Sequence, residues 1–211
     1  KIIAKIWGRI LVLGMKIWLG LNFKLIGSYN KNKPCIFAVK HQSAWETIIC
    51  TSLFDMPSIV LKKELIYLPI IGLYFLKGRA IPIIRENTIE SLKKIVKMAK
   101  TNLSKGSSIL IFPQGTRVPL HASTKDYPYQ SGIYFLYSQC NIPVIPVAHN
   151  AGLFWPKNSF LKYPNKHKTK TVTLKIMDEI PTGLDKKAFM DKLEKSIENN
   201  TRKLIKEEIH G

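Results

Sequence analysis

The sequence predicts an α/β fold with a central, mostly parallel but mixed sheet flanked by helices. Short apolar runs, typical of buried strands, alternate with longer segments whose apolar residues recur at helical spacing. A length of 211 residues fits one domain with a sizeable core, and no internal repeat is visible. We therefore divide the chain into an N-terminal membrane-associating helical segment, residues 1–28, and a single α/β domain, residues 29–211.

The first element is an amphipathic helix over residues 2–21, which are mainly apolar. At about 100° per residue, Lys5, Arg9 and Lys16 fall within about 40° of one another on a helix. A narrow basic stripe on a broad apolar helix is typical of an interfacial, monotopic membrane anchor. A short re-entrant helix hairpin, a membrane span and a helix packed on its own domain are the alternatives. The three charges count against a span.

The elements of the domain follow from apolar periodicity and from turn residues. Strands are expected at residues 22–29, 35–39, 58–61, 80–84, 107–112, 142–148 and 172–177. Helices are expected at residues 43–54, 62–76 with a break at Pro69, 88–103, 133–139 and 185–207. Pro143 and Pro146 favour an edge or irregular position for the strand that contains them. Residues 158–169 are expected to form a lysine-rich loop.

Composition narrows the partners. Hydrophobic residues make up 45% of the chain and charged residues 22%, which excludes a disordered chain. The net charge of +19 attracts phosphates on nucleic acid, an anionic bilayer, an acidic carrier protein or a phosphorylated small molecule. Lysines are spread along the whole chain, and no RNA- or DNA-binding motif is present. Nucleic acid is therefore not an expected partner.

Cysteine and histidine spacings argue against a metal. The three cysteines form no CxxC pair, and Cys35 and Cys50 lie in apolar runs where we expect buried, reduced thiols, as on the cytoplasmic side. No paired metal-ligand spacing occurs among the histidines, which are His41, His121, His149, His167 and His210. We expect no metal site.

A histidine and a carboxylate stand where the 35–39 strand leads into the next helix. Within one regular helix, His41 and Glu46 would point about 140° apart and could not meet. They can meet if His41 lies in the loop and Glu46 in the first helical turn, with Ser43 as N-cap. Glu46 would then fix the imidazole tautomer while the other ring nitrogen faces substrate. Taken alone, the pair also fits a solvated histidine and a glutamate favoured by the helix dipole.

Two further elements follow predicted strands, at the edge where sites gather in such sheets. Arg85 follows the 80–84 strand, and the turn Pro113-Gln114-Gly115-Thr116-Arg117 follows the 107–112 strand. Arginine matches phosphate through its forked donors, and Gly115 lets the backbone approach a ligand closely. No P-loop and no GxSxG motif is present, so nucleotide hydrolysis and a serine acyl-enzyme lack support.

Four blocks in this order resemble those of the glycerolipid (lysophosphatidic acid) acyltransferase family, the PlsC-like enzymes. The blocks are His41-x-x-x-x-Glu46, Ile83-Ile84-Arg85, Phe112-Pro113-Gln114-Gly115-Thr116-Arg117 and Val144-Ile145-Pro146-Val147. The pairing of the first and third blocks makes the resemblance specific. It implies an α/β domain at the cytoplasmic membrane face that transfers an acyl chain from a carrier thioester to a glycerophospholipid hydroxyl.

The resemblance also implies roles for the residues. His41 would be the general base for direct attack by the acceptor hydroxyl, and Glu46 would replace the family's usual aspartate as its orienting partner. Arg85 and Arg117 would bind the acceptor phosphate, while Gly115 and Thr116 shape the turn. Gln114, also in the expected substrate-binding set, replaces the family's usual glutamate, and so no acidic role is open to it. A glutamate at position 46 also occurs in the related enzymes that acylate lipid A precursors.

The expected reaction moves an acyl chain from acyl-carrier protein or acyl-CoA to the sn-2 hydroxyl of lysophosphatidic acid, giving phosphatidic acid. It needs no cofactor. The expected partners are the acyl donor, lysophosphatidic acid and a membrane surface with anionic lipids. The expected location is the cytoplasmic face of the inner (plasma) membrane, peripheral or monotopic. The alternatives are another acceptor (a different lysophospholipid, a lyso-ornithine lipid or a lipid A precursor) or a non-enzymatic basic membrane-binding module.

Overall fold

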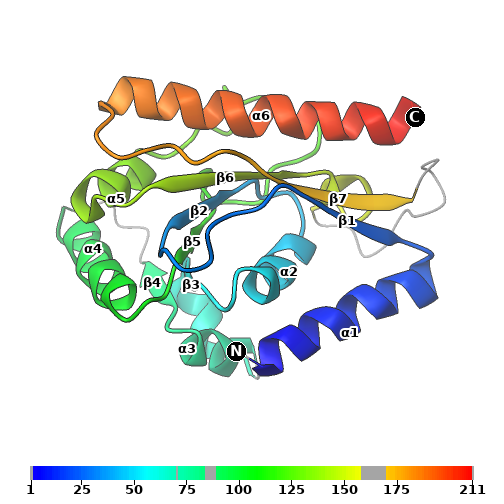
Figure 1. Ribbon diagram of the computed structural model, residues 1–211, viewed down its shortest axis with the longest axis horizontal. Helices are drawn as coiled ribbons and strands as arrows, with labels where there is room; N and C mark the ends of the chain where they lie inside the picture. Colours follow the sequence, from blue (N-terminus) through cyan, green and yellow to red (C-terminus); the bar gives the residue numbers. More distant parts are fainter. Residues whose placement is uncertain (1, 70, 84–88, 158–169, 211) are drawn as a thin grey trace.

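A seven-stranded sheet forms the centre of the computed structural model, which describes residues 2–69, 71–83, 89–157 and 170–210 (Figure 1). The strands are β1 (Asn22–Ile26), β2 (Ile36–Val39), β3 (Ser58–Lys62), β4 (Ile81–Ile83), β5 (Ile109–Ile111), β6 (Val144–His149) and β7 (Thr171–Ile176). They lie in the order β1-β7-β6-β2-β5-β3-β4. Only the β6–β7 pair is antiparallel among the described strand pairs. The predicted α/β class with a mostly parallel, mixed sheet is confirmed.

Helices cover both faces of this sheet. The helices are α1 (Ile2–Leu19), α2 (Trp45–Leu53), α3 (Ile71–Lys77), α4 (Ile89–Ser104), α5 (Gly132–Cys140) and α6 (Lys186–His210), with short 3-10 turns η1 (Lys63–Tyr67) and η2 (Ala151–Leu153). In Figure 1, α6 runs along one side of the sheet, while α1 and α2 lie on the other. Strand β2 is buried on both faces, which explains its continuous apolar sequence.

Two apolar cores result, one on each face. On the α1–α3 face, Phe37 stacks on Phe54 with ring centroids 3.9 Å apart. On the α4–α6 face, Tyr137 stacks on Phe189 at 4.2 Å. The residues predicted to share one face of the last helix are all buried, namely Phe189, Leu193, Ile197 and Leu204. Cys35 and Cys50 are free and buried, as expected, and burial raises the pKa of both thiols.

Strand β6 lies inside the sheet, between β7 and β2, so of the two alternatives that its prolines favoured, an edge or an irregular strand, the edge position is wrong. Pro146 pairs with Ala38 of parallel β2, and its carbonyl accepts a hydrogen bond from Met177 N at 3.1 Å. The antiparallel ladder with β7 begins only at Val147, opposite Ile176. Because the N–H and C=O of one strand residue point to the same side, the missing N–H of Pro146 faces Met177, just after β7, and no bond to β2 is lost.

The region 62–76 is interrupted near Pro69 as predicted, but it is not one broken helix. Strand β3 continues to Lys62, η1 follows, and α3 begins after the proline. A Cβ on Gly72 would lie 1.8 Å from the Ile66 carbonyl oxygen, so glycine lets η1 and α3 approach closely. Much of the apolar surface of this region is exposed, at Leu65, Tyr67, Leu68, Leu73 and Leu76.

Helix α1 is a single helix that leads within two residues into β1. Met15 and the following Leu21 are buried in the α1–α3 core. Side chains on other parts of the helix are exposed, among them Ile10, Leu13, Ile17 and Trp18, as are the basic Arg9 and Lys16. The side chain of Lys5 lies outside the described ones. Among the helices that the structure describes, none has the length and hydropathy needed to cross a membrane.

Candidate active site

His41 lies just beyond the carboxyl end of β2, beside the turn that follows the neighbouring parallel strand β5. Its ring stacks on Phe112 with centroids 3.9 Å apart and planes 18° apart. Its carbonyl accepts a hydrogen bond of 2.7 Å from Val118 N, at the end of that turn. Two of the three predicted strand-end elements therefore meet. The third, Arg85, lies outside the described residues.

The predicted contact between His41 and Glu46 is present, with Nδ1 of the ring 2.8 Å from Oε1 of the carboxylate. Glu46 is the second residue of α2 and is fully buried, while His41 is 17% exposed. The same Oε1 accepts hydrogen bonds from the backbone N–H groups of Gln42 (3.0 Å) and Ser43 (2.8 Å). Glu46 thus fixes both the imidazole and the backbone loop that carries it.

Ser43 supplies the capping contact predicted for it, although α2 as bounded begins at Trp45. The Ser43 hydroxyl accepts a 3.1 Å hydrogen bond from Trp45 N, and Ala44 between them has helical dihedral angles (φ −79°, ψ −20°). The Glu46 carboxylate accepts the Ser43 N–H in return, the reciprocal arrangement of a capping box.

Three hydrogen bonds to Oε1 favour the ionised form of the Glu46 carboxylate. Burial alone would raise its pKa, but His149, His41 and the Ser43 N–H outweigh burial and hold the pKa of Glu46 below its ordinary value. An ionised Oε1 accepts a hydrogen bond from Nδ1–H of a neutral His41, which leaves the lone pair of Nε2 free. The geometry therefore prepares Nε2 of His41 as a base.

His149, the last residue of β6, also contacts this carboxylate, with Nε2 3.8 Å from Oε2 of Glu46. Sequence reasoning missed it, because it was considered only as a metal ligand. Its place next to the Val144–Val147 block at a strand end is the signal that could have found it. Trp45 closes this side of the site, its ring 6.4 Å from that of His149.

The turn after β5 is held by backbone bonds and by one buried amide. Gly115 has a positive φ of 66°, and its N–H donates to the Phe112 carbonyl at 2.9 Å. Gln114 is 5% exposed, and its Nε2 donates to the Tyr127 carbonyl at 2.8 Å. Gln114 therefore ties the turn to the loop before α5. A glutamate carboxylate could not donate this hydrogen bond.

Replacing Gln114 with glutamate is expected to lower the free energy of unfolding by about 1–3 kcal/mol at neutral pH, because a buried carboxylate would then face a carbonyl oxygen. Denaturant unfolding measures this change. Gln130→Glu is the matched control, since the exposed Gln130 amide also donates to a backbone carbonyl, that of Pro128. Equal stability of the two variants would contradict the assigned role of the Gln114 amide.

A pocket of about 950 Å³ opens beside His41. All of the described predicted binding residues line it, namely Gln114, Gly115, Thr116 and Arg117. One part of the lining is apolar and includes Ile59, Leu61, Phe75, Ile83 and Ile95. Cationic side chains also line it: Lys62, Arg117 and Lys157, the last with its ammonium 5.5 Å from the centre of the Tyr127 ring. The pocket thus combines a base, an apolar wall and positive charge.

Nothing in the described part of the chain groups three metal-ligating His, Cys, Asp or Glu side chains. Chemically, the arrangement could support general-base chemistry: an imidazole held by a buried carboxylate lies next to a pocket with apolar and cationic walls.

The α/β sheet and the histidine–carboxylate pair after a parallel strand agree with the family to which the sequence comparison assigns the chain. Residues 22–150 match the model of the family described as Acyltransferase, and the chain belongs to this family.

Among its relatives are proteins named 1-acyl-sn-glycerol-3-phosphate acyltransferase. The one from Pseudomonas aeruginosa is 36% identical over 165 residues, covering 78% of this chain and 63% of the relative. The one from Limnanthes douglasii is 26% identical over 165 residues, covering 77% and 57%. The chain thus spans less than two thirds of the length of these relatives. The crystal structure of PlsC, the LPA acyltransferase from Thermotoga maritima, shares the fold, with a TM-score of 0.76 at 19% identity over 95% of this chain and 78% of that one.

Proposed function

We propose that this chain is a 1-acyl-sn-glycerol-3-phosphate acyltransferase. It moves an acyl chain from acyl-carrier protein or acyl-CoA to the sn-2 hydroxyl of lysophosphatidic acid and releases phosphatidic acid. The observation that carries the proposal is the His41–Glu46 pair, joined at 2.8 Å beside a pocket with apolar and cationic walls. The names of the relatives point to the same reaction.

In this mechanism, Nε2 of His41 removes the proton from the acceptor hydroxyl as its oxygen attacks the thioester carbon. Glu46 stabilises the imidazolium that forms, through the Nδ1–Oε1 bond. The C–S bond then breaks, and the imidazolium returns its proton to the departing thiolate. The new ester and the free thiol account for all atoms, so no acyl-enzyme is needed.

The pocket supplies the binding groups. Arg117 faces the same pocket as His41, and we assign it to the acceptor phosphate, because a guanidinium matches phosphate oxygens through two parallel donors. Gly115 and Thr116 shape the turn that holds Arg117. Arg85 keeps the same role on the strength of its sequence block alone. The apolar wall, which includes Ile59 and Leu61, suits the acyl chain.

The direct test incubates the purified chain with labelled acyl-CoA or acyl-carrier protein and a panel of acceptors in mixed micelles. We expect transfer to lysophosphatidic acid to exceed transfer to lysophosphatidylcholine, a lyso-ornithine lipid and a lipid A precursor. Faster transfer to one of the other acceptors would replace the proposed acceptor but keep the reaction. Salt-sensitive vesicle binding with no transfer to any acceptor would overturn the enzyme assignment in favour of a membrane-binding module.

We also propose that residues 1–28 attach the protein to an anionic membrane at its cytoplasmic face. Apolar side chains exposed on α1 support this, such as Ile17 (67% exposed) and Trp18 (86% exposed). Arg9 and Lys16 on the same helix are exposed and suit anionic headgroups. The exposed apolar residues of η1 and α3 enlarge this surface, because both elements cover the same face of the sheet as α1.

Replacing Ile17 with glutamate is expected to weaken binding to vesicles of phosphatidylglycerol and phosphatidylethanolamine by about tenfold or more, since burial of such a side chain contributes about 1.5–3 kcal/mol. Co-sedimentation measures the partition coefficient. The matched control is Ile209→Glu, at an exposed apolar residue of α6 on the opposite face of the sheet. An equal loss in both variants would attribute binding to net charge alone and refute the α1 surface.

A further inference from the structure

His149 and His41 lie on either side of the Glu46 carboxylate. Nδ1 of His41 contacts Oε1, and Nε2 of His149 lies 3.8 Å from Oε2. Both His149 and Glu46 are 0% exposed, so water does not screen their interaction. The mechanism above uses only the first of these two histidines. His149 is therefore a buried polar side chain, beside the Glu46 carboxylate, to which the mechanism assigns no role.

Two hydrogen bonds determine the protonation of His149. Its Nε2 lies 2.7 Å from the carbonyl oxygen of Lys40, and its Nδ1 lies 3.2 Å from the N–H of Ala151. A carbonyl can only accept and a backbone N–H can only donate, so His149 is a neutral imidazole with its proton on Nε2. Burial also favours the neutral form. It lowers the pKa of His149, and this effect is larger than the opposite effect of Glu46 and the Lys40 carbonyl.

Neighbouring residues hold His149 in place. Asn150 donates to the Thr171 carbonyl (3.1 Å) and accepts from Thr173 N (2.8 Å), which anchors the end of β6 to β7. The charged and titratable groups that face His149 are Glu46 from α2 and Lys40 and His41 from the end of β2. The Lys40 ammonium forms a 2.6 Å ion pair with Glu198 of α6. Lys40 is therefore already paired, and its charge does not balance that of Glu46.

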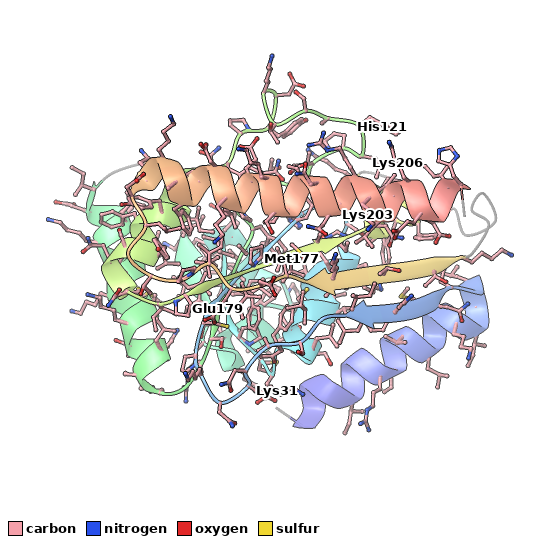
Figure 2. All side chains as sticks on the ribbon, turned by 45° about the horizontal axis from the view of Figure 1, so that its top comes forward. Lys31, His121, Met177, Glu179, Lys203 and Lys206 are labelled. Atoms are coloured by element: carbon pink, nitrogen blue, oxygen red, sulfur yellow. The ribbon has the colours of Figure 1, made fainter. Side chains whose placement is uncertain are left out.

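Figure 2 shows how α6, which carries Glu198, lies over the strands that end at this site, with Lys203 and Lys206 farther along the same helix. The ion pair with Lys40 thus joins α6 to the residue that precedes His41. The Lys40 carbonyl is held from the other side by His149. Lys40 is therefore fixed at both its side chain and its backbone, directly before the catalytic base.

The two oxygens of Glu46 differ in their surroundings. Oε1 accepts three hydrogen bonds, whereas Oε2 is buried without a hydrogen-bond partner in the described part of the chain. An ionised oxygen in that position is costly unless a positive dipole faces it. The Nε2 atom of His149, which carries a polarised N–H, lies 3.8 Å from Oε2 of Glu46.

We propose that His149 is a positioning residue for acyl transfer. Its Nε2–H holds the Lys40 carbonyl, next in the chain to His41, and presents a positive dipole to Oε2 of Glu46. Both effects keep the carboxylate ionised and aimed at the base. The proposal rests on the proposed function, because it gives His149 a role only through His41 and Glu46.

The test compares His149→Leu, which removes the donor, with His149→Gln, whose amide N–H can occupy the place of Nε2–H. We expect His149→Leu to lower kcat about tenfold, as for residues coupled in one network, with the KM for lysophosphatidic acid unchanged. The acid limb of the kcat/KM profile should move to higher pH. A less stabilised carboxylate binds a proton more readily, so the His41–Glu46 pair as a whole stays protonated up to a higher pH. His149→Gln should recover most of both changes.

Tyr137→Phe is the matched control, because it also removes a buried donor to a backbone carbonyl, that of Pro181 at 2.6 Å, on another element. It should lower the melting temperature and leave the acid limb in place. If His149→Leu also changes only the melting temperature, the positioning role is refuted.

Two nuclear magnetic resonance measurements are independent of turnover. In the unmodified chain, ¹⁵N shifts should show His149 as the neutral Nε2–H tautomer throughout the neutral range. The carboxyl ¹³C shift of Glu46 should titrate at higher pH in His149→Gln and His149→Leu than in the unmodified chain, and most in the latter. An Nδ1–H tautomer, or an unchanged Glu46 titration, would overturn the inference even if the chain does not transfer acyl groups. Absence of acyl transfer with both shifts as expected would instead refute the proposed function alone.

Discussion

Replacement of His41 with alanine is expected to lower kcat for acyl transfer by about 10²–10⁴-fold, the usual contribution of a general base. The hydroxyl of the acceptor would then lose its proton to water, which is neither positioned nor as basic as Nε2. The KM for lysophosphatidic acid should change little, since the proposed phosphate ligands are Arg117 and Arg85, not His41. Initial rates with labelled acyl donor measure both parameters.

The matched control is His121→Ala, because His121 is exposed and does not line the pocket. Its activity should equal that of the unmodified chain. His41→Ala is expected to fold normally, since the loop keeps the two backbone hydrogen bonds to Glu46. Full activity in a folded His41→Ala variant would refute the general-base mechanism.

Replacement of Glu46 with glutamine should have an effect of similar size, and it should also affect stability. The amide keeps the shape of the side chain but loses the charge that stabilises the His41 imidazolium, so we expect kcat to fall about 10²-fold or more. Glu46→Asp keeps the charge but withdraws it by one methylene from three donors, and its loss should be smaller. Equal rates for Glu46→Gln and the unmodified chain would show that the carboxylate charge is not used.

The same residue predicts a pH dependence of stability. The pKa of Glu46 is lower in the folded chain than its ordinary value of 4.5, so the folded state binds fewer protons than the unfolded state between the two values. Glu46 therefore stabilises the fold fully at pH above 4.5, and this stabilisation is lost as the pH falls through the folded pKa. Melting curves should show a weaker loss at acid pH for Glu46→Gln than for the unmodified chain. Identical acid profiles would contradict the low pKa.

Local sequence was enough to predict the His41–Glu46 contact. The two residues are five positions apart, and a strand end followed by a helix start leaves few ways to arrange them. Glu46 could be placed in the first helical turn for the same reason. The predicted strands likewise placed His41 and the Gln114–Arg117 turn at strand ends. Since β2 and β5 are parallel neighbours, those ends meet.

The surroundings of the pair could not be read from the sequence, because they depend on residues distant in the chain. His149 contacts the Lys40 carbonyl across 109 positions, and the ion pair of Lys40 with Glu198 spans 158. The prolines of β6 favoured an edge or an irregular strand, yet β6 lies inside the sheet, because the missing N–H of Pro146 faces Met177 and not β2. The residues next to Lys40 and Pro146 in the sequence do not indicate which distant residues these two will contact.

The sequence by itself therefore determined the α/β class, the main helices and strands, and the contact of His41 with Glu46, since these follow from periodicity and from contacts within a few residues. Only the tertiary structure decided the order of the strands and the donor that Gln114 supplies to Tyr127. It also decided the second histidine beside Glu46. All three features depend on which strands lie side by side. The strand order depends on burying both faces of the whole sheet, so no single segment specifies it.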